Sequence, residues 1–322
     1  MFTGYLAMLA TLLMWSGFFL SLRMGAQSAL TLADIALLRF MLPAIVLLPF
    51  VIKHRAAIRD TPWRLKLGLL IGCGLPYLWV AGNGMQLAPV SDGSALIPGT
   101  LPLFVTALAV LVYRQSLSHH RVIGLCLIVV GIAIFLHYGA SAGNHQLNGY
   151  LVLLVASFMW SVFTICARVA ALNALAVAGW VSLLSSLTLA LLIGTGVAPS
   201  TLASVDVTLW PYDELLRHLL LQGLGAGIIA AFTYLHAIAH LGAERSAAFA
   251  ATTPAIATLL AWFFLQESAS AVSLLALGCI SLGSIIASNV FLKNDQSVAF
   301  TVKPYTVKPY TVKPKAANAK QP

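Results

Sequence analysis

Residues 4–16 (GYLAMLATLLMWS) and residues 149–161 (GYLVLLVASFMWS) are nearly the same thirteen-residue sequence. Each stretch opens a half of the chain that holds roughly five apolar segments, close to the length of about 20 residues that a membrane-spanning helix needs. A half with an odd number of spans ends on the side of the membrane opposite to its start, so the second copy enters the bilayer inverted. The repeat therefore predicts an all-α integral membrane protein with about ten transmembrane helices in two inverted five-helix repeats.

A second pair of segments supports the duplication. The sequence SDGSALIPGTLPLF, from Ser91, aligns with AERSAAFAATTPAI, from Ala243, and this alignment places Pro102 on Pro254. Two matches at similar offsets favour a tandem duplication over the chance similarity of apolar helices. We place the repeats at residues 1–140 and 147–292, followed by a tail at residues 293–322.

The composition excludes a soluble protein. Of the 322 residues, 60% are hydrophobic and 8% are charged, and the mean hydropathy is +0.93. About ten spans of about 20 residues occupy most of this length and leave no room for a separate soluble catalytic domain. The expected spans are residues 3–22, 32–52, 66–86, 91–112, 121–138, 148–167, 174–194, 218–238, 246–265 and 271–291.

Positive charge is concentrated on one side of the expected membrane. With the N-terminus inside, the cytoplasmic loops and the tail hold most of the 18 Lys and Arg residues, whereas the outer loops hold only Arg23 and Arg217. Cytoplasmic loops are enriched in Lys and Arg, so this bias predicts a multi-pass protein of the plasma (inner) membrane with both termini in the cytoplasm. The net charge of +9 thus reflects topology, and we expect no nucleic-acid partner.

The tail repeats the pentad TVKPY from Thr301, with a proline in every copy. Such a sequence has no capacity for a buried core, so residues 293–322 are expected to form a disordered basic cytoplasmic tail. Two roles stay open for this tail: a tether to anionic lipids, or a solvated extension with no role of its own.

Polar and aromatic side chains recur on one face of several expected spans. Ser157, Trp160, Ser161 and Thr164 follow the helical spacing i, i+3, i+4 and i+7. Unpaired polar atoms in hydrocarbon are costly, so such faces should look into the bundle or a water-filled cavity. Serine and threonine alone could equally serve helix packing. The candidates for lining a substrate cavity are Trp15, Tyr77, Trp79, Asn83, Trp160, Ser161, Thr164, Tyr234 and His236.

A second group of residues is expected to act in gating or structure. Prolines within spans remove a backbone donor and favour a kink, and Arg39 lies about seven residues inside its span, where a charge needs a partner. We expect Arg39 to form an ion pair with Asp34, Asp92 or Glu267, which lie at the same expected level. The members of this group are Arg39, Pro98, Pro102, Pro254 and Glu267.

The sequence gives no indication of a catalytic residue, a metal site or a cofactor. The four cysteines lie in apolar segments without a CxxC pair, so we expect free thiols rather than disulfides or metal ligands. His236 and His240 are four residues apart but lack the carboxylate of a zinc-hydrolase motif. His236 is instead a candidate for coupling transport to protons, or for an ordinary hydrogen bond.

Several short motifs resemble one known family. These are MWS in the first span, LLRF around Arg39, SALIPGTLPLF and GLCLIVVGIAIF. The chain resembles the EamA-type members of the drug/metabolite transporter (DMT) superfamily, over nearly all of residues 1–292. The resemblance implies an alternating-access carrier with a central cavity between two inverted repeats. The family often has a glutamate after the fourth and the ninth span, whereas this chain has Gln115 and Glu267.

The expected function is therefore an alternating-access secondary transporter, an exporter of amino acids or similar small neutral or zwitterionic metabolites. Its partners would be the small-molecule solute, the lipid bilayer and, as a candidate coupling ion, a proton. The alternatives are a passive channel, an intramembrane enzyme, or a carrier of drugs or nucleotide sugars. The sequence lacks HExxH and paired intramembrane aspartates, so we expect no enzyme.

Overall fold

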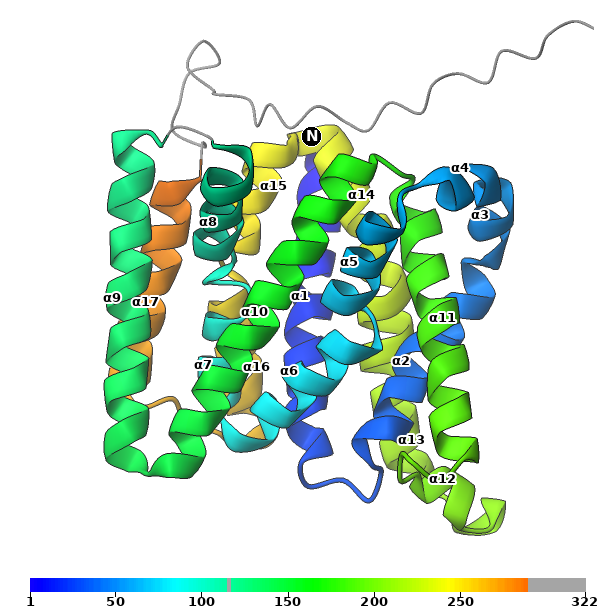
Figure 1. The fold of residues 1–322 in the computed structure, drawn as a ribbon. Coiled ribbons are helices and arrows are strands. Elements are labelled where there is room, and N and C mark those ends of the chain that lie inside the picture. The colour runs from blue at the N-terminus through cyan, green and yellow to red at the C-terminus, as the bar shows by residue number, and fades with distance from the viewer. Residues whose placement is uncertain (115–116, 289–322) are drawn as a thin grey trace, which may run out of the picture.

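The computed structural model is a bundle of helices that run between two edges, called here the upper and the lower edge as they appear in Figure 1. The structure describes residues 1–114 and 117–288, and among these it contains no β-strand. Gln115 and the expected disordered tail lie outside the described residues. The elements are α1 (Phe2–Gly25), α2 (Leu32–Val46), α3 (Leu48–Lys53), α4 (Arg55–Asp60), α5 (Trp63–Cys73), α6 (Leu75–Leu87), α7 (Val90–Leu96), α8 (Leu101–Tyr113), α9 (His119–Ala142), α10 (Asn144–Ala170), α11 (Ala174–Gly194), α12 (Thr201–Ser204), η1 (Val207–Leu209), α13 (Tyr212–His218), η2 (Leu219–Ile229), α14 (Ala230–Leu241), α15 (Ala243–Ala250), α16 (Thr253–Leu265) and α17 (Ala271–Ala287).

These helices account for the expected spans. Within the described residues, 7 helical stretches are long and apolar enough to cross a membrane. They are Phe2–Gly25, Trp63–Leu87, Val90–Val112, His119–Ala142, Asn144–Ala170, Ala174–Gly194 and Tyr212–Leu241. The shorter apolar helices α16 and α17 correspond to the last two expected spans, and α2 and α3 lie within the second expected span. The prediction of an all-α membrane protein is confirmed.

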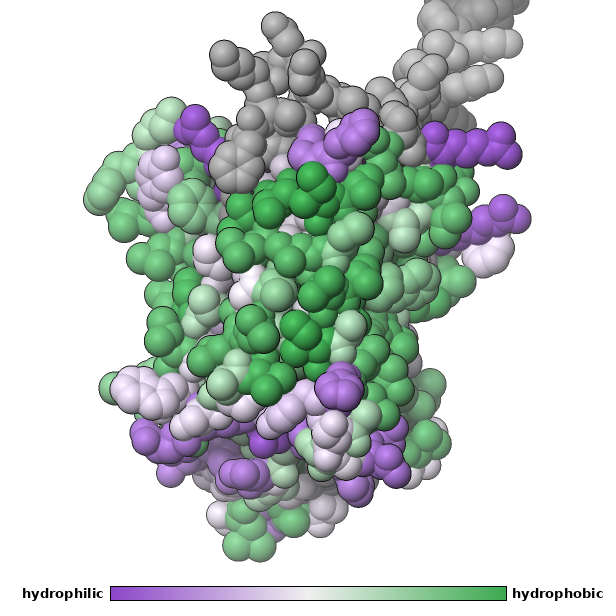
Figure 2. Space-filling model, turned by 90° about the vertical axis from the view of Figure 1, so that its left-hand side faces the viewer, coloured by the Kyte–Doolittle hydropathy of each residue, from purple (hydrophilic) through white to green (hydrophobic). Residues whose placement is uncertain are grey.

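The surface of the bundle agrees with a position in a bilayer. Figure 2 shows an apolar belt around the middle of one face, with hydrophilic side chains gathered above and below it. Large apolar side chains are widely exposed, including Leu111 (79%) and Phe263 (65%). Exposure on this scale is unfavourable in water, so lipid is the environment that these faces require.

The two halves run in opposite directions. Helix α1 begins at the upper edge, where the N-terminus lies, whereas α10 begins at the lower edge after the turn from α9 (Figure 1). The helices α8 and α16 repeat each other in detail. Thr100 before α8 has φ −90° and ψ −4°, and Thr252 before α16 has φ −86° and ψ −7°. Both helices end on a left-handed residue, Arg114 (φ 50°) and Gln266 (φ 53°). The backbone thus preserves the duplication.

Several spans are broken rather than continuous, which the sequence patterns did not predict. Pro102 and Pro254 were expected to kink their spans, but each lies in the first turn of a new helix, α8 or α16, where its missing N–H donor is not needed. Pro98 lies in the irregular segment between α7 and α8. The break between α5 and α6 is stabilised by a neighbouring helix, because the Leu75 N–H group donates to Ser185 Oγ of α11 (3.1 Å).

A close pairing between the halves joins α9 to α17. A Cβ atom at Gly124 would lie 2.5 Å from Ala287 N, and one at Gly283 would lie 2.7 Å from Gly124 O. The two backbones are therefore in direct contact, which is the packing that small residues allow in membrane helices.

Candidate functional site

Four expected cavity residues form a continuous row of aromatic rings near the middle of their spans. Tyr234 of α14 lies 4.9 Å from Trp15 of α1, measured between ring centroids. Trp15 lies 6.4 Å from Trp160 of α10, and Trp160 lies 5.4 Å from Tyr77 of α6. We call these four residues the aromatic row. Two members come from each half of the chain, so the row crosses the boundary between the repeats.

The duplication itself builds the centre of this row. Trp15 and Trp160 are the tryptophans of the two repeated MWS motifs, and their rings meet edge to face at an interplanar angle of 79°. The serine that follows each tryptophan is fully buried, and Ser16 Oγ donates to Thr253 O of α16 (3.4 Å). Equivalent residues of two inverted helices therefore contact each other at the centre of the bundle.

The serine and threonine candidates of α10 make bonds within the protein. Ser161 Oγ donates to Ser157 O (2.9 Å), and Thr164 Oγ1 donates to Trp160 O (2.9 Å). Ser157 Oγ donates to Ile97 O (2.8 Å) and accepts from Thr100 Oγ1 (2.8 Å), which satisfies the broken backbone between α7 and α8. These contacts agree with the packing alternative for the hydroxyl groups of α10.

Among the described residues, the other three cavity candidates make no ring contact with the aromatic row. Asn83 is exposed on α6, where its Nδ2 donates to Trp79 O (2.7 Å), and Trp79 packs half-buried against the main core. His236 is exposed on α14, where its ring stacks on His240 at 4.0 Å. The main core also contains Tyr77, so Trp79 packs in the same region as one member of the aromatic row.

The ion pair expected for Arg39 does not form within the described part of the chain. Arg39 Nη1 instead donates to the carbonyl oxygen of Gln222 (3.1 Å), and its guanidinium carbon lies 5.6 Å from the centroid of Phe18. Gln222 belongs to η2, a π-helix, and such segments often mark functional sites. Arg39 therefore lies beside the aromatic row through Phe18, one turn of α1 after Trp15.

Two of the acids that were expected to pair with Arg39, Asp34 and Asp92, bond to other residues. Asp34 closes the capping box of α2 with Thr31. Asp92 accepts from Tyr150 Oη (2.5 Å) and from Ser91 Oγ (2.8 Å). These contacts hold the Asp34 and Asp92 carboxylates at the starts of their helices. Arg39 donates to a backbone carbonyl instead.

Two buried polar atoms near Arg39 have no hydrogen-bond partner among the described residues. They are Tyr77 Oη and Gln222 Oε1. Tyr77 belongs to the aromatic row, and Gln222 provides the carbonyl to which Arg39 donates. An unsatisfied buried polar atom costs about 1–3 kcal/mol, so these atoms mark a place where a bound molecule would supply the missing bonds.

Glu267 takes part in a closure of the lower edge that the sequence did not reveal. Arg23 Nε lies 3.4 Å from Glu267 Oε2, and Arg23 Nη1 donates to Gln86 O (3.1 Å). Arg23 thereby joins the end of α1 to the end of α6 and to the connection between α16 and α17. In the sequence Arg23 appeared only as an outer-loop charge, because nothing in it brings residues 23, 86 and 267 together.

Two curated proteins are similar to this chain over most of its length. The uncharacterized transporter YdfC of Bacillus subtilis (strain 168) is 22% identical over 280 residues, covering 84% of this chain and 86% of that protein. An uncharacterized transporter of Clostridium kluyveri is 25% identical over 294 residues, covering 88% of this chain and 92% of that protein. A structure titled "Crystal structure of protein" has a TM-score of 0.58 at 20% identity, covering 88% of this chain and 96% of the other, which supports the fold alone.

A family profile matches both halves of the chain. The EamA-like transporter family matches residues 2–137 and residues 147–289, which together make up most of the sequence. The family consists of transporters and not of enzymes, which confirms that expectation. The chain is therefore a multi-pass membrane protein that belongs to the EamA-like transporter family of the DMT superfamily.

Proposed function

We propose that this transporter works by alternating access and exports small neutral or zwitterionic metabolites, foremost amino acids, across the plasma membrane. The observation that carries the proposal is the aromatic row, which joins α1 and α6 of the first half to α10 and α14 of the second. A solute bound against this row contacts both halves at once. A rocking motion of one half against the other then changes the side to which the solute is exposed.

The chemistry around the row supports a carboxylate-bearing solute. Within the described residues, Arg39 donates one hydrogen bond to a carbonyl, and a guanidinium offers five N–H donors that match a carboxylate in two-pronged geometry. The unpartnered Tyr77 hydroxyl can donate to a carboxylate, and the unpartnered Gln222 Oε1 can accept from an ammonium group. Aromatic faces also attract an ammonium group through cation–π interaction. One cation among aromatic rings suits a zwitterion better than a polyanion such as a nucleotide sugar.

The distribution of charge supports the orientation. The basic segment from Lys53 to Lys66 lies at the upper edge, together with the N-terminus, whereas the Arg23–Glu267 pair lies at the lower edge. The positive-inside rule then makes the upper edge cytoplasmic. In this orientation the Arg23–Glu267 pair acts as a closure on the outer side, in the gating role expected for Glu267.

Counterflow in proteoliposomes tests the proposal. Purified full-length protein is reconstituted into vesicles loaded with one unlabelled amino acid, and the uptake of a labelled amino acid is followed with and without a pH gradient. We expect saturable exchange that depends on the internal solute, and an effect of the pH gradient would identify protons as the coupling ion. Flux of all small solutes without saturation would indicate a channel, and a changed product without net movement would indicate an enzyme; either result would contradict the proposal.

The solute class is tested with matched analogues in the same assay. An amino acid, the amine that lacks its carboxylate and the amide that neutralises it are offered as competing internal solutes. We expect exchange with the amino acid and a loss of exchange with the other two, because only the first presents a carboxylate to Arg39. Equal exchange of all three, or preference for lipophilic cations, would assign this transporter to a different substrate class.

A further inference from the structure

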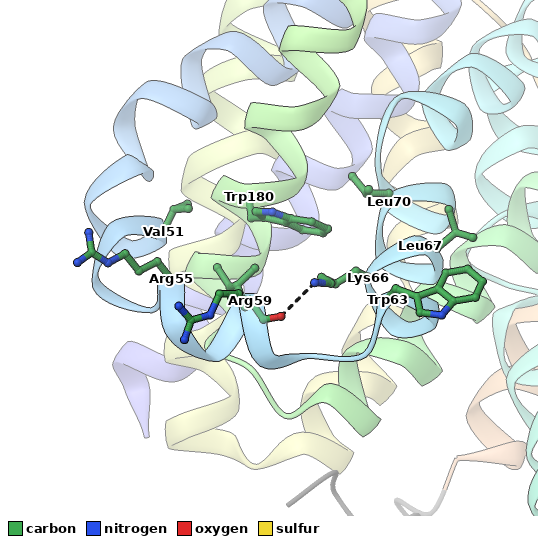
Figure 3. A pocket seen from close by; sticks show the side chains of 9 residues that line it. Val51, Arg55, Arg59, Trp63, Lys66, Leu67, Leu70 and Trp180 are labelled. Carbon is green, nitrogen blue, oxygen red and sulfur yellow. Dashed lines mark hydrogen bonds between the residues drawn. The ribbon is translucent and has the colours of Figure 1, made fainter. Parts of the chain in front are cut away.

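A second site lies at the upper edge, away from the aromatic row. It is a pocket of about 520 Å³ between the short helices α3 and α4 on one side and the start of α5 on the other, with Trp180 of α11 between them (Figure 3). None of its lining residues belongs to the aromatic row. The volume lies within the usual range for small-molecule sites.

The rim of this pocket is positively charged. Arg55 and Arg59 of α4 and Lys66 of α5 line it. Within residues 1–114 and 117–288, Arg55 forms no ion pair, and Asp60 is the one carboxylate in contact with the rim. Arg59 Nε lies 3.1 Å from Asp60 Oδ1, which leaves its two terminal nitrogens available. The rim therefore has an excess of positive charge.

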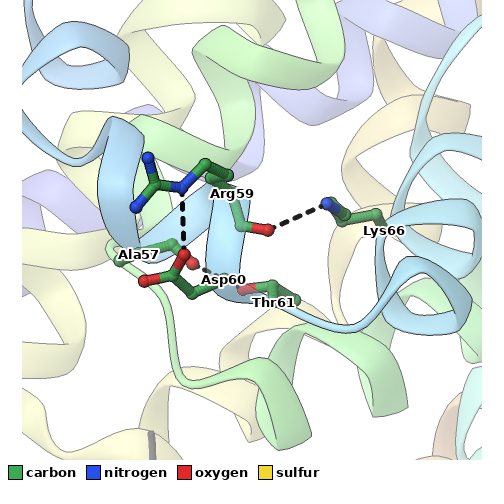
Figure 4. Close-up of polar contacts among 5 residues, drawn as sticks. All are labelled: Ala57, Arg59, Asp60, Thr61 and Lys66. Carbon is green, nitrogen blue, oxygen red and sulfur yellow. Dashed lines mark hydrogen bonds and ion pairs between the residues drawn. The ribbon is translucent and has the colours of Figure 1, made fainter. Parts of the chain in front are cut away.

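Hydrogen bonds to backbone carbonyls hold Lys66 and the loop between α4 and α5. Lys66 Nζ donates to Arg59 O (3.2 Å), and Thr61 Oγ1 donates to Ala57 O (2.8 Å), as Figure 4 shows. The first bond joins the start of α5 to the end of α4, and the second terminates α4. The loop between the two helices is thus held between α4 and α5, whose residues Arg55, Arg59 and Lys66 all line the pocket.

The floor of the pocket is apolar and faces the membrane. Val51, Leu70 and Trp180 line it below the cations. Beside it, Ile52 (55% exposed) and Trp63 (66% exposed) present apolar surface outward. Tryptophan is enriched where the headgroups of a bilayer meet its hydrocarbon, so the rim lies at headgroup level and the floor at acyl-chain level.

We propose that this pocket binds the headgroup of an anionic phospholipid, with the phosphate among Arg55, Arg59 and Lys66 and the first part of an acyl chain along the apolar floor. Charge complementarity selects the anionic headgroup, and the adjoining lipid-facing surface selects a lipid over a soluble anion. Basic pockets between helices on one side of a membrane bind such headgroups.

The site also connects the two repeats. Arg55 and Lys66 belong to the first half, whereas Trp180 belongs to α11 of the second. Helices α3 and α11 are in close contact, since a Cβ atom at Gly179 would lie 2.8 Å from Val51 Cγ2. A lipid held in the pocket therefore favours the arrangement in which these helices meet at the upper edge. Binding of the lipid should shift the equilibrium between the forms of the transporter.

Native mass spectrometry of the full-length protein from mixed micelles tests the site. The micelles contain phosphatidylcholine and phosphatidylglycerol, and the bound lipids are counted. We expect selective and saturable binding of phosphatidylglycerol. The variant Arg55→Gln should weaken it by about fivefold, and Arg55→Gln/Arg59→Gln/Lys66→Gln by about a hundredfold, because each basic residue near an anionic surface contributes about a fivefold factor.

A matched control distinguishes lipid binding in the pocket from a general attraction of anionic lipid to the basic upper edge. The variant Lys53→Gln/Arg114→Gln/Arg245→Gln removes the same charge from the same edge but no residue of the pocket. It should keep the preference for phosphatidylglycerol. An equal loss in both triple variants would indicate diffuse attraction, and competition by glycerol 3-phosphate at the concentration of the lipid would indicate a soluble-anion site; either result overturns the proposal. Arg55→Gln alone decides the question if the triple variant fails to fold, since Arg55 is exposed and unpaired in the described residues.

Discussion

The variant Trp160→Ala should impair transport and leave membrane insertion intact. Trp160 occupies the middle of the aromatic row, with its ring 6.4 Å from that of Trp15 and 5.4 Å from that of Tyr77. Truncation removes both ring contacts and disconnects Tyr77 from the remaining pair, Trp15 and Tyr234. The remaining spans keep their apolar lengths, so insertion into the bilayer is not affected.

Two separate magnitudes follow from this geometry. Each edge-to-face ring contact contributes about 0.5–1.5 kcal/mol, so the folded bundle loses about 1–3 kcal/mol from the two contacts. A solute ammonium group that lies on a desolvated indole gains about 1–2 kcal/mol. Loss of that interaction raises the KM for counterflow by about 5- to 30-fold. A rise in KM of this size is large enough to be measured from initial rates.

The assay compares initial counterflow rates over a range of solute concentrations, in vesicles that contain equal amounts of monodisperse protein. Trp262→Ala is the matched control, because Trp262 lies on α16 with 60% of its surface exposed and is not part of the aromatic row. We expect the control to keep the KM of the parent protein. An unchanged KM in Trp160→Ala, or an equal rise in both variants, would refute the assignment of the aromatic row as the solute site.

Three further predictions concern other contacts. Arg39→Lys keeps the charge but loses the two-pronged geometry, so the KM for amino acids in counterflow should rise about tenfold or more. Gly124→Leu should destabilise the protein by about 1–3 kcal/mol in thermal unfolding in detergent, because a Cβ atom there would lie 2.5 Å from Ala287 N. Glu267→Gln breaks the partly exposed lower-edge ion pair, worth about 0.5–1 kcal/mol. It should speed maleimide labelling of Ser16→Cys from that side about two- to fivefold.

The sequence contained enough information for the bundle and for the contact at the centre of the candidate site. A bilayer restricts the possible structures to apolar helices of nearly fixed length, so span positions can be read from composition alone. The repeated MWS motif also placed Trp15 and Trp160 at equivalent depths in inverted helices. Two helices that enter from opposite sides bring such mid-span residues to the same level, and the structure has these two rings in contact.

The contacts of Arg39, Asn83 and His236 could not be obtained in this way. The spacing of polar residues identifies a shared helix face, but the rotation of that helix within the bundle depends on all of its neighbours. The partner of Arg39 was hidden for a second reason. Its carbonyl acceptor belongs to a π-helical segment, and the departure of η2 from α-helical geometry has no signature in the apolar run LLLQGLGAGII.

The features that differ between the two repeats are also the ones that would determine which solutes bind. An exact inverted repeat would present the same groups from both halves and would suit a solute with matching ends. In this chain Arg39 lies in the first half only, since α11, the corresponding second span of the other half, contains no charged residue. The π-helix that accepts from Arg39 lies in the second half, with no counterpart among the described elements of the first. Under the proposed function, the aromatic row then binds the common part of the solute, while Arg39 fixes the position of its carboxylate. A carrier of this kind should distinguish an amino acid from a symmetric diamine of similar length, and counterflow with the two solutes as competitors measures that difference.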